Sequence, residues 1–512
     1  MAPRTYLVSA VGCKVNQYEA QQLREVLESA GYQPCCEPGQ PPDGDPLPDL
    51  AVVNTCAVTR TAARKSRQLV RRASRGGQTP VIVVGCAAAA EPERYRQIDG
   101  VVALVRHDDD LAAQLARVLD AVQNQRPYNE LSAVTQNPST AAGGRVCDRR
   151  HQDGTASAAS PSVGATPSGN RSITTKAPET GQVKWVLRRT IRRLDGHQRA
   201  FLKVQDGCDA ACTYCIIPRV RPRLASKPID VAVREAADLV ASGHREIVVT
   251  GIFLGAYGRA TARPSRHAAG PAPLAELLDA LARVPGLLRV RLSSLEPGDV
   301  TDDLLDVMAR HPTCVPHLHL PAQAGADAVL KRMNRQYRID AYLSAVERVR
   351  HRLDRPAITT DLIVGFPGET DGDFERTLDL VDRVGFARVH AFPFTLRPGT
   401  AAERWRDEQL PHDVVRDRMR RLQALADQTA QAYRRQFIGQ TERVIVESPD
   451  SSAAGHAWQG RTDRYFPVTF PAPADPDLRG RVADVSIHAV DADGVTGTLS
   501  HVQHRLDVPG RP

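Results

Sequence analysis

Strand-like apolar runs alternate with helical patterns along two long stretches of this chain, and this order limits the fold. Near the N-terminus, the runs RTYLVSAVGC, DLAVVNTC and TPVIVVGC are separated by amphipathic segments at residues 19–32 and 60–77. Strand followed by helix, repeated, predicts a parallel α/β sheet. The order resumes between residues 198 and 432, with the runs RAFLKVQDGC, REIVVTGIFLG, RVRLSSLEP, PHLHLPAQ, AITTDLIVGFPG and ARVHAFPFT. This second stretch predicts a partial (β/α)6 barrel, with an open doubly wound sheet as the alternative.

Each of the three N-terminal runs ends in a cysteine, namely Cys13, Cys56 or Cys86. In open α/β sheets, ligands bind beyond the carboxyl ends of the strands. Three thiols placed there would converge on one point, and the repetition favours a metal site over three ordinary buried cysteines.

The remaining segments differ in composition from these two α/β stretches. Residues 151–180 are dominated by Gly, Ala, Ser, Thr and Pro, which bury too little apolar surface to repay ordering. The last part of the chain contains short strands and turns without a helical pattern, which predicts a small antiparallel β-barrel. We therefore expect an α/β domain at 1–125, a disordered linker at 126–196, a barrel domain at 197–434 and the small β-barrel at 435–505.

Charge and cysteine content suggest a partner and a cellular location. The net charge is +8 and the pI is about 9.0, which suits a polyanionic partner. The apolar runs are shorter than the roughly 20 residues of a membrane span, so we expect a cytoplasmic protein with no membrane partner. In that reducing compartment the ten cysteines are expected to be reduced, metal-bound or catalytic.

The loop VQDGCDAACTYCIIPRVRPR carries Cys208, Cys212 and Cys215 in the pattern C-x3-C-x2-C. A structural zinc site needs four ligands, and no fourth Cys or His lies nearby. The carboxylates of Asp206 and Asp209 are poor partners for soft thiolates. Three cysteines without a fourth suit a four-iron cluster whose open iron can hold a substrate or a cofactor.

This loop, with Tyr214 before its last cysteine, resembles the signature of the radical S-adenosylmethionine (SAM) superfamily. The resemblance implies that Cys208, Cys212 and Cys215 bind a [4Fe-4S] cluster that cleaves SAM to a radical. Across the chain, GCKVNQYEA, NTCAVT, VVGC, RLSSLEP, HLHLPAQAGADAVLKRMNRQY, DLIVGFPGET and RPGTAA resemble the tRNA methylthiotransferase family in order and spacing. That family implies a second [4Fe-4S] cluster on Cys13, Cys56 and Cys86, where sulfur is inserted.

Within the family, GCKVNQYE and NTCAVT are similar to the MtaB type. This type adds a 2-methylthio group to N6-threonylcarbamoyladenosine at position 37 of tRNA, next to the anticodon. The alternatives are the same chemistry on N6-isopentenyladenosine in tRNA or on a ribosomal protein, and a zinc-containing RNA-binding protein. The sequence identifies neither the sulfur donor nor the electron donor.

The resemblance also marks candidate contacts to SAM at strand ends of the barrel. For the polar members, a strand-end or helix-cap role is the competing interpretation. The candidates are Tyr214, Thr250, Gly251, Ser294, Glu296, Gln323 and Gly365.

Candidate RNA contacts lie in three basic regions. The helical segment at residues 60–75 is rich in arginine and contains no acidic residue, and the C-terminal barrel resembles the RNA-binding TRAM module. Basic grooves with an aromatic platform suit the single-stranded anticodon loop of a tRNA stem-loop. In the loop VQDGCDAACTYCIIPRVRPR, which we call the radical loop, and in the C-terminal barrel, the predicted contacts are Arg219, Arg221, Arg223, Arg461, Arg464 and Tyr465.

Overall fold

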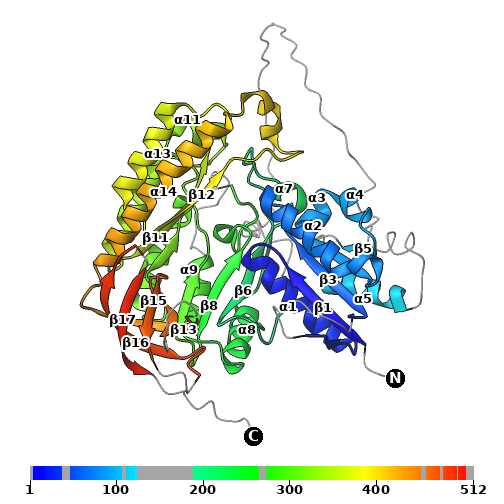
Figure 1. The fold of residues 1–512 in the computed structure, drawn as a ribbon. Coiled ribbons are helices and arrows are strands. Elements are labelled where there is room, and N and C mark those ends of the chain that lie inside the picture. Colours follow the sequence, from blue (N-terminus) through cyan, green and yellow to red (C-terminus); the bar gives the residue numbers. More distant parts are fainter. Residues whose placement is uncertain are drawn as a thin grey trace, which may run out of the picture.

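In the computed structural model, the chain forms an N-terminal sheet, a central partial barrel and a small C-terminal barrel, in that order (Figure 1). The described residues are 4–36, 47–105, 111–123, 187, 189–263, 273–450, 457–472, 477–492 and 494–502. The expected linker, 126–196, lies outside them over 126–186 and at 188. Within these ranges, no helix has the length and apolar character needed to cross a bilayer.

The N-terminal region is a five-stranded parallel sheet in the order β2-β1-β3-β4-β5. Its strands are β1 (Thr5–Ala10), β2 (Gln33–Pro34), β3 (Leu50–Thr55), β4 (Val81–Gly85) and β5 (Val101–Val105). Its helices are α1 (Lys14–Ser29), α2 (Arg60–Ser74), η1 (Arg75–Gly77), α3 (Cys86–Ala90), α4 (Pro92–Arg96) and α5 (Leu111–Gln123). Every residue of β3 and β4 is buried, as expected for central strands of a parallel sheet covered on both faces. The predicted parallel α/β sheet is confirmed.

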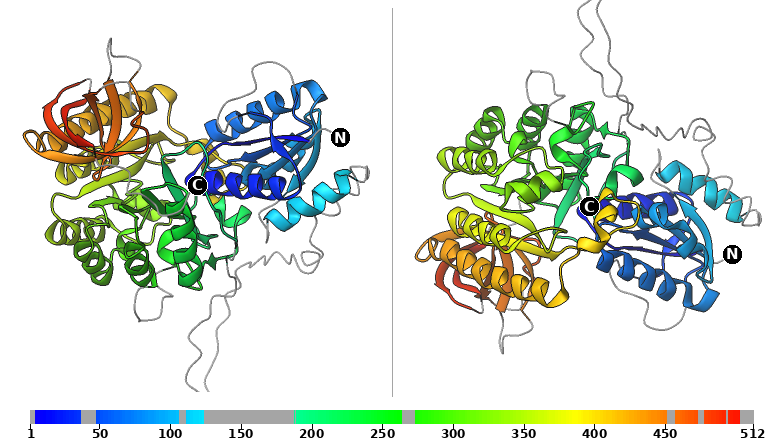
Figure 2. Two further views of the ribbon diagram at one scale, coloured as in Figure 1. Left: turned by 90° about the horizontal axis from the view of Figure 1, so that it is seen from below. Right: turned by 90° about the horizontal axis from the view of Figure 1, so that it is seen from above.

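The central region is a partial barrel of six parallel strands with helices between them (Figures 1 and 2). The strands are β6 (Arg199–Asp206), β8 (Glu246–Gly251), β9 (Arg289–Leu292), β10 (His317–His319), β11 (Ala357–Val364) and β12 (Arg388–Pro393), with the short antiparallel β7 (Ala225–Ser226) beside β6. Parallel bridges from Val290 to Cys314 and from Ser294 to His319 join the sheet that ends in β9 to the sheet that begins with β10. The predicted six-unit partial barrel is therefore confirmed.

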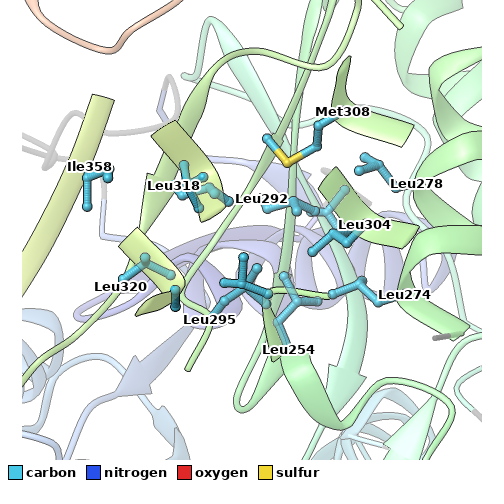
Figure 3. Packing of buried hydrophobic residues seen from close by; sticks show 14 of the residues in the cluster. Leu254, Leu274, Leu278, Leu292, Leu295, Leu304, Met308, Leu318, Leu320 and Ile358 are labelled. Carbon is cyan, nitrogen blue, oxygen red and sulfur yellow. The ribbon is translucent and has the colours of Figure 1, made fainter. Parts of the chain in front are cut away.

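Helices cover the outside of this partial barrel. The longer ones are α8 (Ile229–Ala241), α9 (Pro273–Ala282), α10 (Asp302–Arg310), α12 (Ile339–Arg352), α13 (Asp371–Val384) and α14 (His412–Arg435). Shorter helices of the central region lie in its loops: α7 (Ile217–Val220), η3 (Leu254–Ala256), η5 (Pro297–Asp299), α11 (Asp327–Arg332) and η6 (Ala401–Glu408). Figure 3 shows strand residues such as Leu292 and Leu318 packed against Leu278, Leu304 and Met308 from α9 and α10. Each buried side chain of this kind contributes about 1.5–3 kcal/mol, so the core fixes the strand ends in place.

The C-terminal region is a closed five-stranded barrel in the order β13-β14-β15-β17-β16. Its strands are β13 (Thr441–Pro449), β14 (Ala457–Thr462), β15 (Pro467–Pro471), β16 (Val482–Val490) and β17 (Val495–Val502). Four pairings are antiparallel, and a parallel pairing at Thr469 and Thr496 closes the barrel. The predicted small β-barrel is confirmed, although the strand pattern did not reveal this parallel contact.

Buried charges join this small barrel to the beginning of β8 and β9. Glu246 accepts a hydrogen bond from Arg291 Nε at 2.8 Å and also pairs with Arg289. Arg289 in turn donates to the carbonyl of Arg461 at 2.9 Å and forms an ion pair with Asp463. Burial opposes ionisation of Glu246, but the two guanidinium groups outweigh it and lower the pKa to about 2. The small barrel is thus fixed at the end of the partial barrel opposite to the strand carboxyl ends.

Candidate cluster and SAM site

Cys13, Cys56 and Cys86 directly follow or nearly follow the carboxyl ends of β1, β3 and β4, which are neighbours in the N-terminal sheet. The β3–β4 ladder pairs Thr55 with Gly85, so Cys56 and Cys86 leave the sheet at the same level. We call these three residues the sheet triad. Parallel register alone therefore brings together thiols that are far apart in the sequence.

The loop after β1 is locked against the end of β3. Gly12 has φ +119, and a Cβ atom on it would lie 2.6 Å from the Cβ atom of Cys56. Asn16 donates from Nδ2 to the carbonyls of Val11 at 2.8 Å and Thr55 at 3.1 Å. A side chain at position 12 would push the Cys13 loop away from Cys56, so glycine is required there.

The buried thiols of the sheet triad favour their neutral form. Burial raises the pKa of Cys56 to about 12 and also raises the pKa of Cys86, where the Arg221 guanidinium offsets part of the shift. Thiolates in this position need a strongly positive group such as a metal to hold them deprotonated. Among the described residues, no three His, Cys, Asp or Glu side chains gather as a single metal ion requires.

Buried cationic donors lie beside the sheet triad. Arg221 donates from Nε to Cys86 Sγ at 3.2 Å. Arg397, only 8% exposed, interacts electrostatically with Glu91 and, less strongly, with Cys56, and its Nε and Nη2 have no hydrogen-bond acceptor within the described part of the chain. A buried guanidinium without an acceptor is costly, so an anionic group at this point would stabilise it. The Arg221 donor directed at Cys86 fits a thiolate-ligated, negatively charged iron–sulfur cluster.

Cys208, Cys212 and Cys215 lie in the loop between β6 and α7, and we call them the loop triad. The Cys208 N–H donates to the carbonyl of Arg221 at 3.0 Å, and the Cys215 N–H donates to the carbonyl of Cys212 at 3.1 Å. Burial raises the pKa of Cys208 and raises that of Cys215 to about 12. These thiols therefore also need a strongly positive group such as a metal to hold them deprotonated.

A segment more than one hundred residues later supports the loop triad. The N–H of Thr213 donates to the carbonyl of Met333 at 3.0 Å, and its hydroxyl donates to the carbonyl of Arg332 at 3.0 Å. Asn334 Nδ2 donates to the carbonyl of Ala211 at 2.8 Å. The loop is therefore held from the α11 side of the partial barrel.

Arg335 is a site residue that the sequence interpretation missed. The residue is 8% exposed. Its guanidinium donates to Cys212 Sγ at 3.3 Å and forms an ion pair with Glu296 at 2.6 Å. It also lies 3.5 Å from the Tyr214 hydroxyl, and the Tyr214 ring meets Phe366 edge-on at 6.4 Å. Arg335 stands in the quoted stretch KRMNRQY, but no local spacing connects it with Cys212. A cationic donor on Cys212 fits a cluster bound by the loop triad.

The other candidate SAM contacts lie at strand ends, as expected. Thr250 and Gly251 end β8, and a Cβ atom on Gly251 would lie 2.9 Å from the Gln205 side chain. Ser294 is exposed just after β9, whereas Glu296 is already engaged by Arg335. Their contacts with SAM remain predictions.

Gln323 and Gly365 lie beside the carboxyl end of β11, and their main-chain donors are used within the protein. The Gln323 N–H donates to the carbonyl of Asp361 at 2.8 Å, and the Gly365 N–H donates to the Glu369 carboxylate at 2.8 Å. A Cβ atom on Gly365, which has φ +77, would lie 2.6 Å from Val415 of α14. The glycine therefore has a packing reason that is independent of SAM.

The three arginines predicted as RNA contacts in the radical loop have different environments. Arg219 is exposed and Arg223 is half-buried. Arg221 is 2% exposed and paired with Glu19 and Asp206, so its guanidinium does not lie on the surface as expected. The reason is that two carboxylates, the buried Glu19 from the N-terminal region and the half-buried Asp206 from the partial barrel, hold it inside.

The three residues predicted as RNA contacts in the small barrel lie where it meets the partial barrel. Arg464 donates from Nε to the carbonyl of Arg355 at 3.1 Å and forms an ion pair with Asp354 at 3.0 Å, just before β11. Tyr465 has φ +73, and the guanidinium groups of Arg291 and Arg461 stack over its ring at 4.7 and 5.0 Å. These contacts give the residues a role in docking the two barrels, and their role toward RNA remains a prediction.

Helix α2 presents a basic surface beside the sheet triad. It begins shortly after Cys56 with Thr59 as its N-cap, and it contains no acidic residue. We call its exposed cationic side chains the α2 stripe, and they are Arg60, Arg64, Lys65, Arg71 and Arg72. A stripe of this kind suits contacts with a phosphate backbone.

Comparison with known proteins defines the class of this site. Residues 202–381 match the radical SAM superfamily, and residues 5–106 match the uncharacterized protein family UPF0004. The fold is similar to that of the radical SAM methyltransferase TsrM from Kitasatospora setae, with a TM-score of 0.53 at 16% identity, covering 78% of this chain and 74% of that chain. The chain is therefore a radical SAM protein, a class that uses SAM and a [4Fe-4S] cluster.

Curated relatives narrow the class to a family. The chain is 32% identical to the threonylcarbamoyladenosine tRNA methylthiotransferase MtaB of Chlamydia pneumoniae, covering 97% of this chain and 98% of that protein. It is 32% identical to the MtaB of Bacillus subtilis, covering 94% and 93%. It is 33% identical to the tRNA-2-methylthio-N(6)-dimethylallyladenosine synthase of Sphingopyxis alaskensis, covering 87% of each. The chain belongs to the radical SAM tRNA methylthiotransferase family, so it is a sulfur-group-transferring enzyme that acts on tRNA.

Proposed function

We propose that this enzyme adds a 2-methylthio group to N6-threonylcarbamoyladenosine at position 37, in the anticodon stem-loop of tRNA. We also propose that the sheet triad binds a second [4Fe-4S] cluster, beside the one bound by the loop triad. Overall identity does not choose the modified adenosine, because relatives that act on two different ones are 32–33% identical to this chain. The residues around Cys13 and Cys56 favour the threonylcarbamoyl type.

The choice of substrate rests on Nε and Nη2 of buried Arg397, which have no hydrogen-bond acceptor among the described residues, while the guanidinium interacts electrostatically with Glu91 and Cys56. A threonylcarbamoyl group has a carboxylate, which can accept two charge-assisted hydrogen bonds from a guanidinium. An isopentenyl group has no acceptor and would leave Nε and Nη2 of Arg397 without a hydrogen bond, at a cost of about 1–3 kcal/mol. Arg397 therefore supports the acidic substrate over the apolar one.

The residues of the two triads then have separate roles. When bound, SAM and the clusters supply an organic radical, a methyl group and a site for the inserted sulfur. The protein orients these groups and keeps water away from them. The burial of Cys56, Cys86 and Cys208 serves this exclusion, and Arg335 fixes Cys212 and Tyr214 relative to each other.

The α2 stripe is suited to hold the RNA backbone while the target base enters the site. Bases of an anticodon loop can be splayed out of the stack into a pocket without opening a long duplex. Because α2 begins next to Cys56, phosphates bound along it would lie close to the sheet triad.

The test is a comparison of two synthetic anticodon stem-loops, one with threonylcarbamoyladenosine and one with isopentenyladenosine, with reconstituted enzyme. The wild type is expected to methylthiolate the first and not the second. R397Q is expected to lower kcat/KM on the first at least about tenfold, because a charged hydrogen bond is lost. R406Q, at an exposed arginine, is the matched control and should leave the rate unchanged. Equal turnover of both stem-loops by the wild type would contradict the proposed substrate.

A further inference from the structure

Arg221 contacts both cysteine triads. Its side chain donates from Nε to Cys86 Sγ at 3.2 Å, and its own carbonyl accepts the N–H of Cys208 at 3.0 Å. Cys86 belongs to the sheet triad and Cys208 to the loop triad. One residue therefore connects the third cysteine of one set with the first cysteine of the other.

The rest of the guanidinium is held by two carboxylates from the two regions. Nη1 and Nη2 each donate at 2.9 Å to Glu19 of α1, and Nη1 also donates at 2.8 Å to Asp206 at the end of β6. Lys203 pairs with the same two carboxylates at 2.7 and 2.6 Å. The two cations, Arg221 and Lys203, balance the charges of the two carboxylates, so this group of four side chains is neutral. The carboxylates hold the Arg221 guanidinium in place, while its Nε–H is directed at the Cys86 sulfur.

The loop triad has a parallel arrangement with one pair. Arg335 donates to Cys212 Sγ at 3.3 Å, and its charge is balanced by Glu296 at 2.6 Å. Each triad thus has one buried, charge-balanced guanidinium directed at one of its sulfurs. Hydrogen bonds to ligand sulfurs, together with net charge and burial, set the reduction potential of an iron–sulfur cluster.

We propose that Arg221 is a positioning residue that raises the reduction potential of the cluster on the sheet triad, and that Arg335 does the same for the cluster on the loop triad. The inference rests on the proposed second cluster. The guanidinium stabilises the added negative charge of the reduced cluster, and each arginine acts on its own cluster. Arg221 thereby makes the potential of the sulfur-inserting site depend on the docking of the two regions.

The experiment measures each potential by electron paramagnetic resonance during a dithionite titration, in a background that retains one triad. C208A/C212A/C215A leaves the sheet triad, and C13A/C56A/C86A leaves the loop triad. R221M/E19Q removes the guanidinium and keeps the buried set neutral, and R335M/E296Q does the same beside Cys212. R221K is the second variant at position 221, because it retains the charge but replaces the planar guanidinium fork, which is directed at Cys86 and both carboxylates, with a compact ammonium.

R221M/E19Q is expected to shift the midpoint of the sheet-triad cluster to a more negative potential and to leave the loop-triad cluster unchanged. R335M/E296Q should do the reverse, and R221K should produce a smaller negative shift than R221M/E19Q. If the sheet-triad cluster is bound in both Arg221 variants and its midpoint potential is unchanged, the role of Arg221 is wrong, while the proposed second cluster stands. Absence of any cluster in C208A/C212A/C215A would instead overturn the proposed second cluster, and the inference with it.

Discussion

The two cysteine triads are held in place by different means. The sheet triad takes one cysteine from the end of each of three neighbouring parallel strands, and its geometry follows from strand register. The loop triad occupies eight consecutive residues, and its geometry depends on hydrogen bonds from residues 332–334 and from Arg221. The ends of sheet strands are held by the hydrogen bonds of the sheet itself, whereas a loop needs hydrogen bonds from other segments to keep its shape. The sheet triad should therefore be sensitive to backbone packing, and the loop triad to single polar contacts.

The largest expected effect separates the triads by their iron content. If each binds one four-iron cluster, the wild type holds about eight irons per chain and each triple Cys→Ala variant about four. Iron and acid-labile sulfide would be measured after anaerobic reconstitution. Full iron content in C208A/C212A/C215A would show that the loop triad does not hold iron.

Backbone packing at the sheet triad is tested by G12A. Alanine at φ +119 is strained, and its Cβ atom would overlap Cys56, so we expect a loss of about 4 kcal/mol in stability and a lower iron content. G31A is the matched control, because Gly31 also has a positive φ, +86, but has no atom within 4 Å of the added Cβ. It should cost only about 1 kcal/mol. Thermal unfolding and iron analysis of both variants measure the difference, and equal losses would refute the packing role of Gly12.

A pH effect is expected on the side of the loop triad. Burial raises the pKa of Asp299 to about 7, with the Glu296 carboxylate adding to the shift. The folded protein therefore keeps a proton that the unfolded chain loses near pH 4, and stability falls as the pH rises from about 4 to 7. D299N should remove this dependence and stabilise the protein at pH 8 by on the order of 3 kcal/mol. Melting temperatures from pH 5 to 8 provide the measurement, with exposed D303N as the control, and a pH profile unchanged by D299N would disprove the assignment.

The smallest expected effect concerns one supporting contact of the loop triad. T213V removes the hydroxyl that donates to the carbonyl of Arg332, which should cost about 1 kcal/mol. We expect weaker SAM binding by equilibrium dialysis and unchanged iron on the sheet triad. T441V, at the exposed start of β13, is the control. If T213V binds SAM as the wild type does, external support of the loop is unimportant.

The sequence predicted what depends on local order and missed what comes from distant segments. Alternating strand and helix patterns were sufficient for both α/β regions, and the strand-then-cysteine repeat located the sheet triad. The roles of Arg335 and Arg397 could not be predicted, because each approaches a cysteine through tertiary packing alone. Arg221 was predicted as an RNA contact, because the neighbouring sequence gives no sign of its pairing with Glu19, 202 residues away. Arg464 and Tyr465 were assigned to RNA by residue type, which could not reveal their contacts with Asp354 and Arg291 of the partial barrel.

We propose that the two triads divide the chemistry, with radical generation at the loop triad and sulfur insertion at the sheet triad. The decisive measurement quantifies 5′-deoxyadenosine and 2-methylthio product in the same reactions of C56A and C212A, with circular dichroism to show that both variants are folded. We predict that C56A forms no methylthio product but still cleaves SAM to 5′-deoxyadenosine, and that C212A does neither. Normal methylthiolation by folded C56A, or SAM cleavage by C212A, would contradict this division.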